Sequence, residues 1–122
     1  MDKIKFFDGG MGTMLQAAGL KAGQLPETLN ITNKDMILAV HRAYADAGCE
    51  YITANTFGAN CLKFENYDEI IKTGIELAKS VGKKVLLDIG PTGKLLKPMG
   101  ELAFDDAIDI FAKTVIAGKD GA

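Results

Sequence analysis

Cysteine is scarce in this sequence, and long apolar runs are missing. The two cysteines, Cys49 and Cys61, are too few for a disulfide scaffold and do not form a CxxC pair that could hold a structural metal. No apolar stretch approaches the roughly 18 to 20 residues that a membrane-spanning helix needs. Charges at Asp2, Lys3 and Lys5 stand where a signal peptide would become apolar. We therefore expect a cytoplasmic protein with free thiols.

Blocks of one charge are missing as well. The chain has 14 Lys and Arg against 16 Asp and Glu, for a net charge of −2, and neither sign forms a run that could follow a phosphate backbone. We expect neither nucleic acid nor a membrane as partner. The 122 residues, 48% hydrophobic and 25% charged, have the composition of one globular domain.

Hydrophobic periodicity divides the chain into alternating short strands and helices, and glycine marks the end of most segments. The predicted strands are Ile4–Asp8, Cys49–Thr56 and Val85–Ile89. The predicted helices are a short one over Met14–Ala18 and long ones over Thr32–Ala47, Asp68–Val81 and Phe104–Val115. Lys21–Asn30, which contains the breaker Pro26, is predicted to be an irregular loop. Thr32 and Asp35 resemble a capping box at the start of the first long helix.

Alternating strands and helices predict an α/β fold with parallel strands and right-handed crossovers. A doubly wound open sheet and a closed barrel both fit this order, and both place their chemistry at the carboxyl ends of the strands. The glycine cluster at Gly9, Gly10 and Gly12 does not form GxGxxG, and no GxxxxGK[ST] occurs. A nucleotide site therefore has little support.

All three predicted strands end in polar or glycine-rich residues: Asp8–Thr13, Thr53–Gly58 and Asp88–Gly93. Parallel strands would bring these segments to one rim. A glycine-rich turn lets backbone N–H groups face a carboxylate, while nearby carboxylates and hydroxyls can accept hydrogen bonds from an ammonium group. We expect such a rim to bind an amino acid.

At these residues the chain resembles the homocysteine S-methyltransferase family, and most of all the homocysteine-binding module of its cobalamin-dependent members. Matching segments occur in family order over nearly the whole chain. They are Asp8-Gly9-Gly10-Met11-Gly12-Thr13, Pro26-Glu27, Leu29-Asn30, His41-Arg42 with Tyr44, Ala47-Gly48, Thr53-Ala54-Asn55-Thr56-Phe57-Gly58-Ala59 and Asp88-Ile89-Gly90-Pro91-Thr92-Gly93.

The resemblance implies a parallel (β/α)8 barrel of TIM type, which needs about 250 residues, with residues 1–122 forming the first three βα units of an incomplete single domain. It also implies methylation of homocysteine to methionine. A thiol with a pKa near 8.5 is mostly protonated at neutral pH, and binding to zinc makes it a thiolate. In this family three cysteines hold the zinc, one from a Gly-x-Asn-Cys stretch and two from a Gly-Gly-Cys-Cys stretch. Neither stretch is present, so the ligands are expected beyond Ala122.

The methyl donor implied by the resemblance is methylcobalamin or another donor, supplied by other domains or by a substrate. No catalytic residue and no metal ligand is expected within this chain. The implied substrate-binding residues are those of the first loop together with three residues from the other strand ends: Asp8, Gly9, Gly10, Met11, Gly12, Thr13, Asn55, Thr56 and Asp88.

Several of these residues have simpler interpretations. Asp8 could cap its own glycine turn, although its strand-end position favours ligand contact. Asp88 interrupts an apolar strand, and a charge there needs a partner or a function. Cys49 is expected to be a small buried apolar residue, and Cys61, in a rim loop, has no neighbour that would activate it. His41 is expected to be structural, on an outer helix away from the site.

The pair Asp105 and Asp106 is interpreted as favouring the N-terminus of the last helix. Three strands with helices on one side would leave an apolar inner face and two edges in water. The expected partners are therefore homocysteine and either the remainder of the barrel or a second copy of the chain. A non-catalytic half-barrel that self-associates or serves as an assembly module is the alternative.

Overall fold

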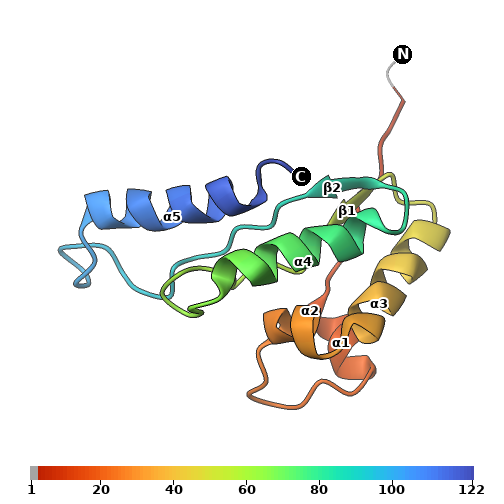
Figure 1. Ribbon diagram of the computed structural model, residues 1–122, viewed down its shortest axis with the longest axis horizontal. Helices are drawn as coiled ribbons and strands as arrows, with labels where there is room; N and C mark the ends of the chain where they lie inside the picture. The colour runs from red at the N-terminus through yellow and green to blue at the C-terminus, as the bar shows by residue number, and fades with distance from the viewer. Residues whose placement is uncertain (1–2) are drawn as a thin grey trace.

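The computed structural model describes residues 3–122 and shows a mixed α/β chain rich in helices (Figure 1). The elements, in chain order, are α1 (Gly12–Ala17), the 3-10 helix η1 (Pro26–Thr28), α2 (Leu29–Thr32), α3 (Lys34–Asp46), β1 (Tyr51–Thr53), α4 (Tyr67–Lys79), β2 (Lys84–Leu86) and α5 (Phe104–Gly118). Within the described residues, no helix is both long enough and apolar enough to cross a bilayer.

The strands pair in parallel, as the alternation of strands and helices predicted. Ile52 of β1 lies opposite Val85 of β2. The predicted first strand is reduced to a single parallel bridge between Phe7 and Tyr51. On this edge the Asp8 N–H donates to the Tyr51 carbonyl oxygen over 3.1 Å. Three chain segments therefore lie side by side in the predicted direction.

All three strands are shorter than the sequence predicted. The prediction of a strand over Ile4–Asp8 was wrong apart from the bridge. Of the predicted Cys49–Thr56, β1 keeps three residues, and of the predicted Val85–Ile89, β2 keeps only Val85 and Leu86 and begins one residue earlier, at Lys84. The Thr56 N–H donates to the Ala54 carbonyl oxygen over 2.9 Å, and this tight turn takes the backbone out of the ladder. The second strand was predicted too long because β-branched residues continue to Thr56. In the structure β1 ends at Thr53, and side-chain hydrogen bonds take the place of the backbone ladder after it.

The segment between α1 and α3 is more ordered than the predicted loop Lys21–Asn30, because it contains η1 and the start of α2. The predicted capping box was wrong. Thr32 lies inside α2, where its hydroxyl donates to the Thr28 carbonyl oxygen over 3.1 Å, and the cap of α3 is Asn33, whose side chain accepts from the Met36 N–H over 3.3 Å. The short helix α1 begins at Gly12, two residues before the predicted start.

Two apolar clusters hold these elements together. One lies between the sheet and α4, where Ile52 and Val85 of the strands meet Ile71 and Ile75 of the helix. The other joins α1, α2 and α3. In Figure 1, α4 runs alongside β1 and β2, while α1, α2 and α3 lie on the other side of α4 from the strands. The segments that follow the strands are thus supported by helices with buried apolar faces.

The helix α5 packs against α4, and most of its large apolar residues are exposed. Its buried positions are Ala107, Ile110, Thr114 and Gly118. A Cβ at Gly118 would lie 2.8 Å from a methyl carbon of Leu87, so a glycine is needed for this close approach. The exposed apolar residues of α5 are Phe104, Ile108, Phe111, Val115 and Ile116. Together they define an uncovered apolar face.

A buried amide pair joins α2 to the end of β1 and to α4. The Asn30 side chain donates to the carbonyl oxygens of Asn55 and Ile70 over 2.8 and 3.1 Å. The Asn55 side chain donates to Asn30 Oδ1 over 3.0 Å and to the Pro26 carbonyl oxygen over 2.9 Å. Both side chains are buried, and buried amides left without partners would cost about 1–3 kcal/mol each. This network fixes the path of the chain after β1.

Gly74 of α4 leaves the space that the amide pair occupies. A Cβ there would lie 2.7 Å from Asn30 Nδ2 and 3.2 Å from Thr56 Cγ2. We expect Gly74→Ala to lower the free energy of unfolding by about 1–3 kcal/mol, because overpacking displaces buried hydrogen-bonding groups. Urea denaturation measures the change. Gly12→Ala is the control, since a Cβ there meets nothing within 4 Å. Equal stability of the two variants would contradict this role of Gly74.

Candidate functional site

Side chains tie the three strand ends to one another. Asp8 accepts two hydrogen bonds from Thr53, one from its N–H over 2.9 Å and one from its hydroxyl over 2.8 Å. The Thr56 hydroxyl donates to the Asp88 carbonyl oxygen over 2.8 Å and accepts from the Asp88 N–H over 3.1 Å. These contacts connect the first segment to the second and the second to the third. We call the joined segments Asp8–Thr13, Thr53–Gly58 and Asp88–Gly93 the rim.

The predicted binding residues differ in how open they are. In the first loop, Gly9, Gly10, Gly12 and Thr13 are exposed, and Asp8 and Met11 are half-buried. Asp88 is half-buried at the end of the third segment. The structure therefore brings the loop and Asp88 to the same rim with accessible backbone and carboxylate groups.

Asn55 and Thr56 are buried, with 5% and 1% of their surfaces exposed. The Asn55 amide nitrogen and the Thr56 hydroxyl already have partners within the chain, Asn55 in the amide pair and Thr56 on Asp88. In the structure these two side chains therefore join neighbouring segments of the chain: Asn55 contacts η1 and α2, and Thr56 contacts the third rim segment.

Glu27 of η1 contacts the rim, although it was absent from the predicted binding residues. Only 6% of its surface is exposed, and its Oε1 accepts from the Gly58 N–H over 2.7 Å. A Cβ at Gly58 would lie 2.9 Å from the same oxygen, so glycine makes room for the carboxylate. The signal in the sequence was an acid directly after Pro26, in a segment interpreted as an irregular loop. Its burial depends on contacts across 31 residues, which periodicity does not reveal.

The rim concentrates negative charge. Burial raises the pKa of Asp88 above its ordinary value, and the charges of Asp8 and Glu27 raise it further. Each carboxylate therefore disfavours ionisation of Asp88, and a cation at the rim would relieve the repulsion. Exposed backbone N–H groups next to clustered carboxylates suit a ligand that carries both an anionic and a cationic group.

His41 lies in the interior, on the inner side of α3. It is fully buried, and within residues 3–122 neither ring nitrogen has a hydrogen-bond partner. Burial lowers the pKa of His41, and the negative charge of Asp8 opposes this shift. The sequence-based interpretation placed His41 on an outer helix away from the site. Its full burial on α3 is compatible with a structural role.

The cysteines do not form a metal site. Cys49 is buried, as predicted, and its thiol donates to the Phe7 carbonyl oxygen over 3.4 Å. Cys61 is half-buried. Within residues 3–122 no three His, Cys, Asp or Glu side chains are grouped so that they could hold a metal ion. The donor atoms of this chain therefore do not fit a zinc ion bound by three cysteines.

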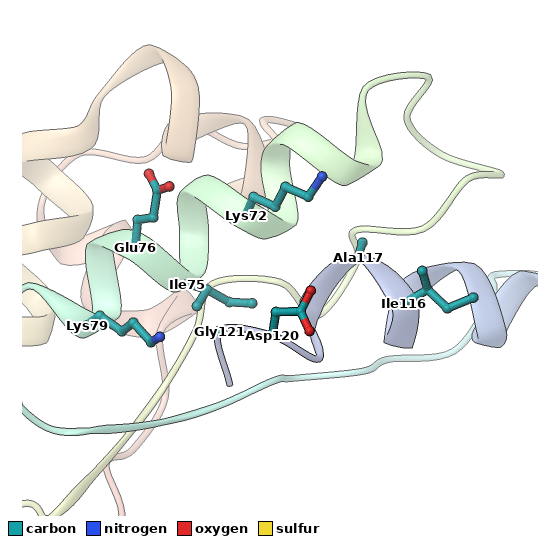
Figure 2. Close-up of a pocket in the computed structure, with 8 residues that line it drawn as sticks. All are labelled: Lys72, Ile75, Glu76, Lys79, Ile116, Ala117, Asp120 and Gly121. Carbon is teal, nitrogen blue, oxygen red and sulfur yellow. The ribbon is translucent and has the colours of Figure 1, made fainter.

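A groove of about 380 Å³ lies between α4 and the end of the chain. Figure 2 shows Lys72, Ile75, Glu76 and Lys79 on α4, with Ile75 directed toward Asp120 and Gly121. None of the rim residues lines it. This groove is therefore separate from the candidate site.

The comparison with protein families gives one match over almost the entire chain. The model of the homocysteine S-methyltransferase family matches residues 5–122. The chain belongs to this family. The resemblance carried by the rim segments is thereby confirmed.

Two curated proteins are similar to this chain over 98% of its length. They are methionine synthase of Mycobacterium tuberculosis, 30% identical over 140 aligned residues, and methionine synthase of Mycobacterium leprae, 29% identical over the same length. The chain spans 12% of the length of each.

The fold is also that of a solved family member. The metallated form of the homocysteine methyltransferase MmuM from Escherichia coli superposes with a TM-score of 0.80, at 19% identity, over 99% of this chain and 51% of that one. Its oxidized form gives a TM-score of 0.62 at 22% identity over 74% of this chain and 38% of that one. At these identities the likeness shows the fold.

The lowered pKa of His41 predicts acid sensitivity. The folded chain favours the neutral imidazole, so its contribution to stability is complete above the unfolded pKa of about 6.5 and is lost as the pH falls below that value. We expect the melting temperature to drop between about pH 7 and pH 5, and to drop less in His41→Leu. Since His41 is the only histidine, its ring signals in NMR report the folded pKa directly. A folded pKa at or above 6.5 would contradict the prediction.

The raised pKa of Asp88 predicts that its charge destabilises the fold. The folded chain favours the protonated Asp88 carboxyl. Its contribution to the stability of the fold is complete below the unfolded pKa of about 3.8 and is lost as the pH rises through the folded pKa. Asp88→Asn should therefore raise the melting temperature at pH 7, and the gain should vanish near pH 3. The exposed Asp68, in the first turn of α4, is the control, and Asp68→Asn should give no gain because an acid there favours the helix. A gain that persists at pH 3 would speak against a charge effect.

Proposed function

We propose that this chain forms the first three βα units of a homocysteine-binding (β/α)8 barrel, residues 1–122 being the N-terminal part of that domain. The complete barrel would methylate the sulfur of homocysteine to give methionine. Membership of the homocysteine S-methyltransferase family supports this activity. The parallel strands and the likeness to MmuM support the architecture. The observation that carries the proposal is the joining of three strand ends by Asp8, Thr53, Thr56 and Asp88.

In this proposal the rim binds the amino-acid end of homocysteine. The first loop, Gly9, Gly10, Met11, Gly12 and Thr13, faces the substrate carboxylate, because its three exposed glycines place no side chain between their N–H groups and a ligand. The substrate ammonium lies against the carboxylates of the rim. Its positive charge offsets the repulsion that Asp8 and Glu27 exert on Asp88.

Asn55 and Thr56 contribute to this site through position. The Asn55 amide nitrogen and the Thr56 hydroxyl are bonded within the chain, so Asn55 holds the second segment to η1 and α2, and Thr56 holds it to the third segment. Asp8 combines the two roles, since both carboxylate oxygens bind Thr53 while the group stays half-buried at the rim. The chain thereby orients the substrate and leaves the sulfur directed to other parts of the barrel.

The chemistry of methyl transfer is proposed to come from outside these residues. The family resemblance implies a zinc ion on three cysteines, and the two cysteines of this chain do not fit that site. The zinc ligands therefore belong to the remainder of the barrel. The methyl donor, methylcobalamin or another, is supplied by other domains or by a second substrate. By itself the 122-residue chain should neither bind zinc tightly nor methylate homocysteine.

The uncovered apolar face of α5 supports the proposal that a partner completes the fold. Phe104 and Ile116 are 67% and 64% exposed, and on the opposite edge of the sheet Ile4 and Phe6 are 74% and 63% exposed. Exposed apolar surface of this kind marks an interface. The remainder of the barrel is the partner that the proposed function requires. A second copy of the chain, in a non-catalytic half-barrel, is the alternative that the same surface supports.

Titration of the 15N-labelled chain with L-homocysteine tests the proposal. We expect the amide signals of Gly9, Gly10 and Gly12 to shift, and L-methionine, which has the same ammonium and carboxylate, to shift them in the same direction. The control is 2-mercaptoethanol, a thiol without these groups, which should leave them unchanged. Asp88→Asn should weaken the binding because one negative charge near the ammonium is removed. No shift at these glycines, or equal shifts with 2-mercaptoethanol, would refute the proposed site.

Three further readouts on the same sample separate the two forms of the proposal. A purified chain that both binds zinc tightly and methylates homocysteine would contradict the division of roles. One sharp dimeric species in dilute solution, with no response to homocysteine, would favour the self-associating half-barrel. A mixture of aggregates would favour a piece that needs the remainder of the barrel.

A further inference from the structure

Tyr44 connects the packed interior to the glycine loop of the rim. It lies near the end of α3, is half-buried, and packs against both apolar clusters. Its hydroxyl leaves the interior and donates to the Gly10 carbonyl oxygen over 2.8 Å. A well-supported ring thus makes a directed hydrogen bond to a loop 34 residues earlier in the chain.

The loop and the ring fit closely because residue 9 has no side chain. A Cβ at Gly9 would lie 2.9 Å from the Tyr44 hydroxyl oxygen and 3.3 Å from ring carbon Cε1. The backbone φ of Gly9 is not in the left-handed region, so the space that Tyr44 occupies, rather than the backbone conformation, accounts for the glycine. Gly9 and Tyr44 therefore act as a matched pair.

The hydrogen bond has a consequence for the direction of the next N–H group. A trans peptide is planar, and its C=O and N–H point in opposite directions. Since the Gly10 carbonyl is held toward Tyr44, the N–H of Met11, in the same peptide, is held away from α3. Three glycines in four residues would otherwise leave this segment many conformations to lose on binding.

We propose that Tyr44 is a positioning residue for substrate binding, which orients the Gly10–Met11 peptide before the amino acid arrives. This inference rests on the proposed function, because it deepens the role of the first loop. Preorganisation reduces the conformational entropy that binding must offset. Tyr44 does not touch the reacting sulfur, and its effect is on the affinity for the amino-acid end of the substrate.

Tyr44→Phe tests this role by removing the hydroxyl and keeping the ring. We expect homocysteine to bind about fivefold more weakly, as the loss of one neutral hydrogen bond implies, in the NMR titration of the full chain. Tyr67→Phe is the matched control, since Tyr67 is also half-buried at an apolar cluster but lies on α4. In the chain without ligand, the Met11 amide signal should move in Tyr44→Phe and stay in place in Tyr67→Phe.

Gly9→Ala gives an independent test through the contact with the hydroxyl. Alone it should weaken binding, because the new methyl group displaces Tyr44 from Gly10. Combined with Tyr44→Phe it should add little, since the atom 2.9 Å from the new Cβ is gone. Melting temperatures of all variants show whether each is folded. If Tyr44→Phe does not fold, the Met11 amide of Gly9→Ala decides the question.

The possible results separate the two claims. Weaker binding with a shifted Met11 amide and a non-additive double variant supports the positioning role. Wild-type affinity and an unmoved Met11 amide in Tyr44→Phe overturn it, even if homocysteine binds. If wild-type chain does not respond to homocysteine while the Met11 amide still moves in Tyr44→Phe, the orientation of the peptide stands and the assignment of the ligand fails.

Discussion

The arrangement of the rim depends on polar side chains that replace the β-ladder where the strands end. Beyond Thr53 the backbone leaves the sheet, and side-chain hydrogen bonds then keep the segments together: Asp8 to Thr53 on one side and Thr56 to Asp88 on the other. These bonds are partly buried, which strengthens them relative to bonds at an open surface. The exposed residues of the first loop, from Gly9 onward, directly follow Asp8, which these hydrogen bonds hold in place.

The architecture could be predicted from the sequence because it follows from local patterns. Helical periodicity located α3, α4 and α5, and glycine punctuation located the loops that form the rim. The lengths of the strands could not be predicted, because Asn55 and Thr56 leave the ladder through contacts with Asn30 and Asp88, 25 and 32 residues away. The cap at Asn33 was missed for a related reason, since Thr32 offered an equally good local signal.

The candidate site was predictable to a similar extent. Asp8, the glycine loop and Asp88 could be named because polar residues at strand ends are unusual and the family resemblance covers them. Glu27 and Tyr44 could not, because their importance comes from the partners they reach: the Gly58 N–H for the first and the Gly10 carbonyl for the second. In the sequence, a glutamate after a proline and a tyrosine near the end of a helix look ordinary.

The space left by Gly58 has an effect on the electrostatics of the rim. The Glu27 carboxylate is buried there because residue 58 lacks a Cβ, and its charge is one of the reasons why the pKa of Asp88 is raised. Any larger residue at position 58 would expel that carboxylate toward solvent, where water would weaken its influence on Asp88. The absence of a side chain at Gly58 thus influences the proton affinity of Asp88, although Gly58 itself carries no charge.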